Sequence, residues 1–378
     1  MRLCLFIGEM ENELFYGIAL RLMKGIGDAN AKVLISYAGS AERLFKTAPS
    51  KLKKINGIGP KLSETFRDTY QVLLRAEKEL KFIEKHKIQA IFYYDKRYPK
   101  RLHNCSDSPL FLFCKGNFDF NKERFISVVG TRHATDYGKE LCERLIAELA
   151  PFRVNLISGL AFGIDICAHR AALKYDIQNI AVLAHGLDRV YPNLHKGITE
   201  KMQQHGAVIT DFLSETNPDR QNFPSRNRIV AGMADATIVI ESAVAGGALI
   251  TAEIANSYNR DVFAFPGKVQ DIYSAGCHKL IMENKANLVT CANDILEFMS
   301  WDTGVPLKEQ VIQPQLFIEL NEKEDMIYQY LVGKEKVSMD DLIAHISLPQ
   351  SMIANVLLQL EMKGIIVSLP GKMYKISS

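Results

Sequence analysis

Cysteines are few in this sequence, and none of them is paired at short spacing. Seven are present among 378 residues, and no two stand in a CxxC arrangement. They are scattered at positions 4, 105, 114, 142, 167, 277 and 291. This pattern argues against both a disulfide framework and a zinc site, so we expect reduced and mostly buried thiols. No metal-ligand or nucleotide Walker spacing is found either, and we expect no metal and no cofactor.

Long apolar runs and a strong charge imbalance are also missing. The mostly apolar opening is interrupted by Glu9, Glu11 and Glu13 without a small-residue cleavage site, which argues against a signal peptide. No later stretch approaches the roughly 18 apolar residues of a membrane span, so we expect a cytoplasmic protein. The 46 basic and 43 acidic residues give a formal net charge of +3. This charge is too small for the chain to bind nucleic acid as a simple polycation, so any such binding needs a local basic patch.

Periodicity divides the chain into three regions and a linker. Residues 1–80 show short helical patterns punctuated by glycine pairs, whereas residues 81–299 alternate strand and helix patterns. Residues 300–317 contain glycine and prolines with weak periodicity, which is typical of a linker. Residues 318–378 carry three helical patterns followed by two strand patterns. Helices followed by a hairpin indicate a winged helix.

The middle region predicts the fold class. Short runs rich in valine and isoleucine alternate there with helix-length segments, which indicates a parallel sheet covered on both faces. We therefore expect a doubly wound, Rossmann-like α/β domain with a mostly parallel sheet. The predicted strands are residues 89–94, 125–129, 154–157, 180–183, 207–210, 236–240, 262–265 and 287–290.

Glycines and hydroxyl groups follow several of these strands. In a doubly wound sheet, ligands sit at the carboxyl ends of the strands. Glycines permit close backbone approach there, and the following helix N-termini offer free N–H groups to an anion. We expect a phosphate-binding site at these strand ends, although glycine at such turns is often structural. Its candidate residues are Gly130, Thr131, Arg132, Ser158, Gly159, Gly163, Gly246, Gly247 and Lys268.

A second basic segment brings arginines next to an aromatic residue. Phe223 is followed by Arg226, Asn227 and Arg228. Arginine binds phosphate through a planar fork, and an aromatic ring can stack on an unpaired base. The combination favours single-stranded nucleic acid. The alternative is that Arg226 and Arg228 pair with carboxylates such as Asp165 or Glu241 and only fix loops.

These residues, in this order, resemble the DNA-processing protein A family, also called DprA or Smf. The resemblance rests on motifs that span about residues 130–281. Two stretches depart from the family pattern, at Ala245–Leu249 and Gly276–Ile281, so hydrogen bonding from those loops is in doubt. The matching motifs are Val128–Arg132, Ser158–Asp165, Gly186–Asp188, Phe223–Ile229, Gly247–Ala252 and Phe265–Gly267.

The resemblance implies a protein that performs no chemistry of its own. Family members carry single-stranded DNA and help load the RecA recombinase, and we expect this chain to protect incoming DNA in natural transformation or another recombination route. Carried over residue by residue, the resemblance assigns phosphate contacts to Arg132, to Lys196 and to the segment from Arg226 to Arg228. Phe223 is the candidate for base stacking. A homodimer is also implied.

The two flanking regions resemble known DNA-binding units. Lys24–Gly27 and Asn56–Lys61 resemble paired helix-hairpin-helix units of a SAM-like helical domain, in which the turns expose backbone amides to a DNA phosphate. The alternative is that they are tight interhelical turns in a domain that contacts protein. In the winged helix, the presumed recognition segment Pro349–Lys363 has Lys363 as its only basic residue. A reader of the major groove normally presents arginine or lysine. Partner binding is therefore favoured over sequence reading.

An enzyme is the alternative from a different class. The fold also resembles lysine-decarboxylase-like nucleotide N-glycosidases, whose Gly-Gly-x-Gly-Thr-x-x-Glu signature corresponds here to Gly246–Glu253. Leu249 and Ile250 stand where Gly-Thr belongs, so the phosphate turn is altered. Asp165 and His169, four residues apart, could form an acid–base pair on one helix face. The competing interpretation is that Asp165 caps the helix and His169 bonds within the loop network.

Overall fold

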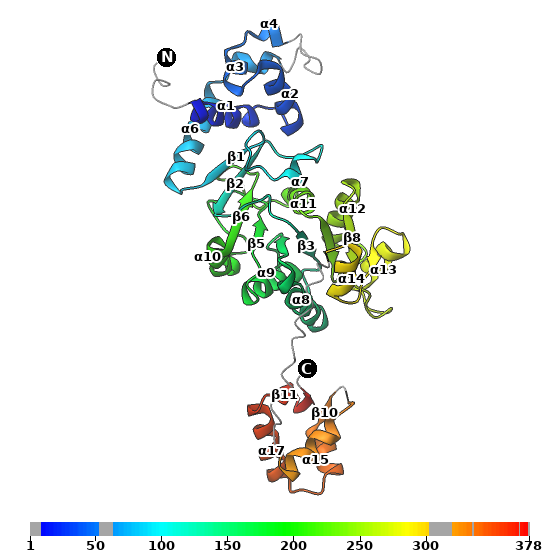
Figure 1. The fold of residues 1–378 in the computed structure, drawn as a ribbon. Coiled ribbons are helices and arrows are strands. Elements are labelled where there is room, and N and C mark those ends of the chain that lie inside the picture. The colour runs from blue at the N-terminus through cyan, green and yellow to red at the C-terminus, as the bar shows by residue number, and fades with distance from the viewer. Residues whose placement is uncertain (1–8, 53–62, 302–319, 335, 370, 377–378) are drawn as a thin grey trace. The chain divides into compact units, whose positions relative to one another are not determined.

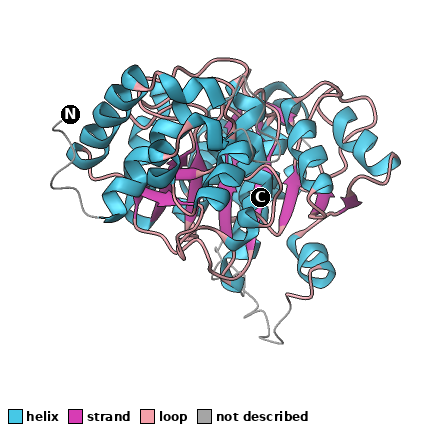
Figure 2. Ribbon diagram, turned by 90° about the horizontal axis from the view of Figure 1, so that it is seen from above, coloured by secondary structure: helices cyan, strands magenta, loops and turns pink. Residues whose placement is uncertain are grey.

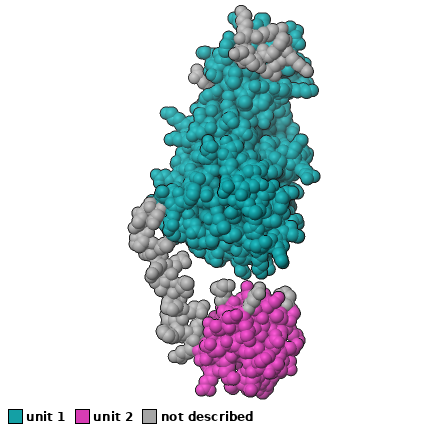
Figure 3. All heavy atoms as spheres, turned by 90° about the vertical axis from the view of Figure 1, so that its right-hand side faces the viewer, with its two compact units in different colours: residues 1–303 teal, residues 304–378 magenta. Residues whose placement is uncertain are grey.

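The computed structural model describes residues 9–52, 63–301, 320–334, 336–369 and 371–376. Residues 1–303 form one compact unit and residues 304–378 a second (Figure 3). Among the described residues, no helix combines the length and the apolar composition needed to cross a membrane.

A mostly parallel sheet runs through the larger unit (Figures 1 and 2). The strands lie in the order β1-β2-β6-β5-β4-β3-β7-β8-β9, and all neighbours from β6 to β9 are parallel. The predicted doubly wound fold is confirmed. The bounds are β1 (Gln89–Phe92), β2 (Phe111–Gly116), β3 (Phe125–Val129), β4 (Asn155–Ser158), β5 (Asn179–Val182), β6 (Gly206–Thr210), β7 (Ala236–Val239), β8 (Asp261–Ala264) and β9 (Asn287–Leu288).

Strand β2 was not predicted from the sequence. It pairs antiparallel with β6 on one side and with β1 on the other. Its residues are mainly aromatic, leucine and cysteine, so it lacks the valine and isoleucine that marked the other strands. The pair extends the parallel sheet at one edge.

The direction of the strand order changes at β3, the first parallel strand. Its successors β4, β5 and β6 lie on one side and β7, β8 and β9 on the other. Chain connections therefore leave β3 and β7 toward opposite sides, which opens a crevice at their carboxyl ends. The five residues of β3 are all buried, so the crevice opens at the end of a fully packed strand.

Helices cover both faces of the sheet. Side chains of α8, α9 and α14 form one apolar core with the strands, and side chains of α11, α12 and α13 contribute to another. The bounds are α7 (Lys100–His103), α8 (Asp136–Leu149), η2 (Ala150–Phe152), α9 (Ile164–Lys174), η3 (Asn193–His195), α10 (Lys196–His205), α11 (Asn222–Met233), α12 (Gly247–Ser257), α13 (Ala275–Met282) and α14 (Ala292–Phe298).

The N-terminal helices share a core with the sheet. Phe111, Phe113 and Val208 from β2 and β6 pack in one apolar cluster with side chains of α1, α2, α3 and α6. Helix α6 runs through the predicted domain boundary at residue 80, and the predicted boundaries stay a prediction. The second predicted Gly-x-Gly turn lies outside the described residues. The bounds are α1 (Glu9–Leu22), α2 (Asp28–Ala38), α3 (Ala41–Lys46), α4 (Pro49–Leu52), η1 (Thr65–Arg67) and α6 (Tyr70–Lys85).

Arg228 joins the N-terminal helices to the sheet. Its Nη2 lies 2.6 Å from Asp211 Oδ2, just after β6, and 3.2 Å from Asp28 Oδ2, at the start of α2. Its Nη1 also donates to the carbonyl of Asp107. Burial raises the pKa of Asp211, and the Arg228 charge opposes that rise. Arg228 is therefore held by carboxylates, as the alternative interpretation expected, but its partners are not Asp165 or Glu241.

The smaller unit is a winged helix, as predicted. A three-stranded sheet in the order β10-β12-β11 packs with three helices around one apolar core. Lys363, which follows the presumed recognition helix, places its Nζ 2.7 Å from both carboxylate oxygens of the buried Glu324. The bounds are α15 (Glu322–Leu331), β10 (Val337–Ser338), α16 (Met339–His345), α17 (Gln350–Met362), β11 (Ile366–Leu369) and β12 (Met373–Ile376).

Replacing Arg228 tests its role as a structural link. Arg228→Met leaves the buried Asp211 carboxylate without its cation, and breaking one partner of such a pair costs about 3–5 kcal/mol of unfolding free energy. Urea unfolding followed by the fluorescence of Trp301, the only tryptophan of the chain, measures the larger unit. The matched control is Arg144→Met on α8, an exposed arginine 3.9 Å from Glu148, which should cost less than about 0.5 kcal/mol. Equal losses would contradict the assignment.

Candidate nucleic-acid interface

A pocket of about 700 Å³ lies at the carboxyl ends of β3, β4 and β7. It occupies the crevice where the strand order changes direction. Nine of the predicted site residues line it, and they come from four segments that are far apart in the sequence. These nine are Gly130, Thr131, Arg132, Gly159, Phe223, Arg226, Asn227, Gly246 and Gly247.

The other five predicted residues lie outside this strand-end pocket. Ser158 is buried and donates to the carbonyl of Val128 at 2.6 Å, which joins β4 to β3. Gly163 precedes α9 with φ +78°, and a Cβ there would lie 2.0 Å from the Thr131 carbonyl oxygen. Lys196 and Lys268 are exposed on the surface, and Arg228 makes the ion pairs described above. The structure therefore gives Ser158, Gly163 and Arg228 contacts within the fold.

Close packing of backbone segments shapes the turn after β3. A Cβ on Gly130 would lie 2.4 Å from the Ile164 side chain, so only glycine fits. The Thr131 amide donates to the Glu241 carbonyl at 2.6 Å, and the Thr131 carbonyl accepts from the Ile164 amide at 3.2 Å. These bonds tie the turn to the end of β7 and to the start of α9. Arg132, the next residue, is thereby held at the mouth of the pocket.

Arg132 is exposed and lies over an aromatic ring. Its guanidinium carbon is 5.0 Å from the centroid of Phe223, a cation–π distance, and Phe223 is half-buried. Tyr191 places its ring 6.3 Å from that of Phe223. No ion pair of Arg132 is present in the described part of the chain. This guanidinium is therefore oriented by the ring yet remains available to an anion.

Arg226 is only 3% exposed and forms the floor of the pocket. Its Nη1 donates to the carbonyls of Gly159 and Val182, at the ends of β4 and β5. A Cβ on Gly159 would lie 2.2 Å from Nη1, so the glycine makes room for the guanidinium. Burial lowers the pKa of Arg226 to about 10, and the Asp165 charge opposes that fall. Arg226 stays charged at neutral pH but is committed to the strand ends.

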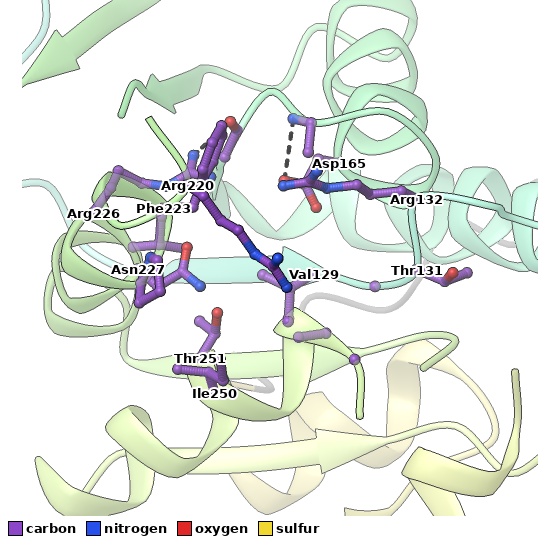
Figure 4. Close-up of a pocket in the computed structure, with 18 of the residues that line it drawn as sticks. Val129, Thr131, Arg132, Asp165, Arg220, Phe223, Arg226, Asn227, Ile250 and Thr251 are labelled. Carbon is purple, nitrogen blue, oxygen red and sulfur yellow. Dashed lines mark hydrogen bonds between the residues drawn. The ribbon is translucent and has the colours of Figure 1, made fainter. Parts of the chain in front are cut away.

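Arg220 is a pocket residue that the sequence did not reveal. It is exposed, lines the pocket and extends into it beside Phe223 (Figure 4). It stands in the loop before α11, where no strand ends and no glycine marks the position. Its spacing of three residues from Phe223 was the available signal. Arg132, Arg220 and Arg226 together bring three guanidiniums to one pocket.

Asp165 is the one carboxylate among the residues that line the pocket. It is buried at the start of α9 and accepts from the Ala161 amide at 3.3 Å (Figure 4). Burial raises its pKa, whereas the Arg226 charge and backbone amides lower it. The electrostatic balance of three guanidiniums against one buried carboxyl favours an anionic ligand.

Asp165 and His169 make separate contacts. His169 is fully buried, and its Nδ1 lies 3.1 Å from Asn179 Oδ1. Burial lowers the pKa of His169 to about 3. A proton shuttle near neutral pH needs a pKa near the operating pH. The predicted helix cap is wrong, because Gly163 is the N-cap residue of α9 without a side-chain cap bond, and Asp165 instead accepts from the preceding loop. The contact of His169 with Asn179 agrees with the interpretation in which His169 belongs to an internal hydrogen-bond network.

The acid required by the enzyme alternative lies away from the pocket. Glu253 is 58% exposed on α12, and its carboxylate is 3.7 Å from Lys285 Nζ. It is not among the residues that line the strand-end pocket. The geometry therefore gives no support to hydrolysis at this site.

An α/β domain with an arginine-lined pocket at its switch point, followed by a winged helix, defines a class of protein suited to an anionic ligand. The family model described as DNA recombination-mediator protein A matches residues 89–300. A second one, the DprA winged helix domain, matches residues 313–372. The chain belongs to the DNA processing protein A family, and the resemblance noted from the sequence is confirmed.

Individual relatives agree with this assignment. Protein Smf of Synechocystis sp. is 28% identical over an alignment of 401 positions, which covers 96% of this chain and 99% of that protein. DNA processing protein DprA of Streptococcus pneumoniae is 40% identical over 213 residues, 56% of this chain and 75% of the relative. The X-ray structure of DprA from Streptococcus pneumoniae has a TM-score of 0.66 and 33% identity, and covers 75% of this chain and 97% of that one.

One further solved structure shares the fold. DNA processing protein A from Helicobacter pylori has a TM-score of 0.52 at 24% identity, with coverage of 57% of this chain and 97% of its own. A single-stranded DNA binding mode is described for the Helicobacter pylori protein. At this identity the likeness shows the fold alone.

The buried His169 makes stability depend on pH. Its folded pKa of about 3 lies below the ordinary value of 6.5, so the unfolded state takes up a proton first as the pH falls. The free energy of unfolding falls from about pH 6.5 downward, and by pH 5 this contribution has lowered it by about 2 kcal/mol. His169→Gln removes this contribution, and we expect its urea midpoint, followed by Trp301 fluorescence, to fall less steeply between pH 7 and pH 5. Parallel curves for the two proteins would show that His169 titrates normally in the fold.

Proposed function

We propose that this protein binds single-stranded DNA in the strand-end pocket. The observation that carries the proposal is the pairing of the exposed Arg132 with the ring of Phe223 at the pocket mouth. A guanidinium contacts a phosphate and an adjacent ring stacks on a base, and only an unpaired base exposes its face to such a ring. Arg220 supplies a second exposed cation. The family, together with the single-stranded DNA binding described for the Helicobacter pylori protein, supports this choice of ligand.

The predicted site residues take different roles in this proposal. Arg132 contacts a phosphate, Phe223 stacks on a base and Asn227 offers an amide from the first turns of α11. A Cβ on Gly247 would meet no atom within 4 Å, so the backbone at the start of α12 is open to the strand, whereas a Cβ on Gly246 would lie 2.2 Å from Ser242 Oγ and this glycine serves the packing of the loop. Arg226 contributes charge from the floor. Lys196 and Lys268 are exposed cations outside the pocket, available for more distant phosphates.

We propose that the bound DNA is protected and then passed to the RecA recombinase, in natural transformation or another recombination route. The family description as a recombination mediator supports this step. A homodimer, expected from the resemblance, and a cytoplasmic location, expected from the sequence composition, are part of the same proposal. No catalytic step is assigned to the pocket.

For the winged helix we propose partner binding. The Nζ of Lys363 lies 2.7 Å from both carboxylate oxygens of Glu324, and the Glu324 side chain is 2% exposed. The basic residue that the presumed recognition helix would offer to DNA is therefore already paired. An apolar and amide-rich helix surface suits a protein partner better than a phosphate backbone.

The central test of ligand binding is Arg132→Ala. Loss of one phosphate contact to a single strand should weaken oligo-dT binding about tenfold and reduce the salt slope of the affinity by about 0.7. Anisotropy titrations across a salt series measure both. Arg144→Ala, which removes an exposed arginine from the outer surface of α8, is the matched control and should behave as the wild type. Unchanged affinity of Arg132→Ala at every salt concentration would refute the assignment.

A second test addresses the proposed transfer to RecA. RecA assembly on labelled oligo-dT, followed by anisotropy, should proceed faster with the wild-type protein than without it, because prebound protein recruits the recombinase. Arg132→Ala should lose this acceleration in proportion to its lost DNA affinity. Acceleration that survives the loss of DNA binding would show that recruitment does not pass through this pocket.

A further inference from the structure

A groove of about 580 Å³ adjoins the strand-end pocket and shares Arg132 and His133 with it. Its walls come from the turn after β3, from α8 and from α9, two helices that pack together on one face of the sheet. We call it the α8–α9 groove. Its lining residues are Arg132, His133, Ala134, Lys139, Phe162, Gly163, Ile166, Cys167 and Arg170.

The α8–α9 groove is lined by cations without carboxylates. Arg132, Lys139 and Arg170 carry positive charge, and no aspartate or glutamate is among the lining residues. Arg170 is exposed and has no ion pair in the part of the chain that the structure describes. Lys139 lies 2.9 Å from Asp136, which is 92% exposed. Such a surface pair contributes little, so Lys139 can exchange it for a phosphate.

An aromatic residue stands in the groove as Phe223 stands in the pocket. Phe162 is 42% exposed, and its ring meets that of His195 edge to face at a centroid distance of 5.0 Å. His195 is buried and its Nδ1 lies 2.9 Å from the Leu160 carbonyl oxygen, so the Phe162 ring packs on a fixed support. A small hollow shares Arg132 and Phe223 with the strand-end pocket and Arg132 and Phe162 with the groove. Arg132 therefore lines one hollow together with these two aromatic rings.

We infer that a single strand crosses Arg132 and continues from the strand-end pocket into the α8–α9 groove. Phe162 stacks on a second base there, and Arg170, with Lys139 beside it, contacts a further phosphate. The alternation of cation and ring is the pattern that tracks an unpaired backbone with splayed bases. The inference rests on the proposed function and extends its site beyond the crevice.

Oligonucleotide length separates the two sites. We compare an oligo-dT of about four nucleotides, enough to fill one site, with one of about 20, long enough to occupy both. Arg170→Ala should weaken only the longer ligand and reduce its salt slope by about 0.7, because one phosphate contact is lost. Phe162→Ala should weaken the longer ligand about tenfold with an unchanged salt slope, because stacking releases no counterion.

Conservative variants and matched controls separate the function of these side chains from their bulk. Arg170→Lys keeps the charge and Phe162→Tyr keeps the stacking face, so both should bind the longer ligand as the wild type does. Arg144→Ala and Tyr70→Ala remove an exposed arginine and an exposed aromatic from outside the groove and should change neither ligand. Circular dichroism confirms that each variant is folded.

Two other outcomes would overturn the inference. Arg170→Ala and Phe162→Ala could leave the affinity for the longer oligo-dT unchanged while Arg132→Ala weakens the binding of both lengths. The strand would then leave the pocket by another path, and the proposed function would stand. If the two variants weaken both lengths equally, they act within the strand-end pocket and the extension is wrong. Failure of Arg132→Ala to weaken either length refutes the proposed function itself.

Discussion

The buried guanidinium of Arg226 is the constraint on which the pocket depends. It lies among the ends of β4 and β5, where the carbonyls of Gly159 and Val182 accept its hydrogen bonds, and the Asp165 carboxyl offsets part of its charge. A buried cation of this kind must keep its partners, because leaving it unpaired costs several kcal/mol. The surrounding turns are consequently fixed, and Gly159 has no room for a side chain. The ligand meets a rigid positive floor rather than a flexible one.

Arg226 and Arg228 lie on the same helix but have different roles, because their positions point their side chains in different directions. Arg226 and Arg228 stand two residues apart on α11, and side chains so spaced point about 200° apart around the helix. Arg226 therefore faces the pocket, whereas Arg228 faces Asp211 and Asp28 and ties the N-terminal helices to the sheet. Within the strand-end pocket, the cations left for a ligand are Arg132 and Arg220, which are exposed. Structural arginines hold the pocket, and exposed ones face the solvent from which DNA arrives.

Local patterns in the sequence predicted the features that depend on neighbouring residues. Alternating strand and helix runs indicated the doubly wound fold, and the glycine turn with Arg132 and the ring of Phe223 marked the pocket. Strand β2 was not predicted because Phe111–Gly116 lacks β-branched residues. The partners of Arg228 could not be foreseen, since Asp28 is 200 residues away in the sequence. Arg220 lies in a loop, and a loop has no periodicity from which the direction of a side chain can be predicted.

The proposed binding mode requires a phosphate on Arg132 and a base on Phe223 at the same time. A structure of the full chain bound to a short oligo-dT would show whether both contacts form. We expect a phosphate oxygen within hydrogen-bonding distance of the Arg132 guanidinium and a thymine ring parallel to that of Phe223. DNA bound through Lys196 and Lys268 alone, with the pocket free of nucleotide, would contradict the proposed function.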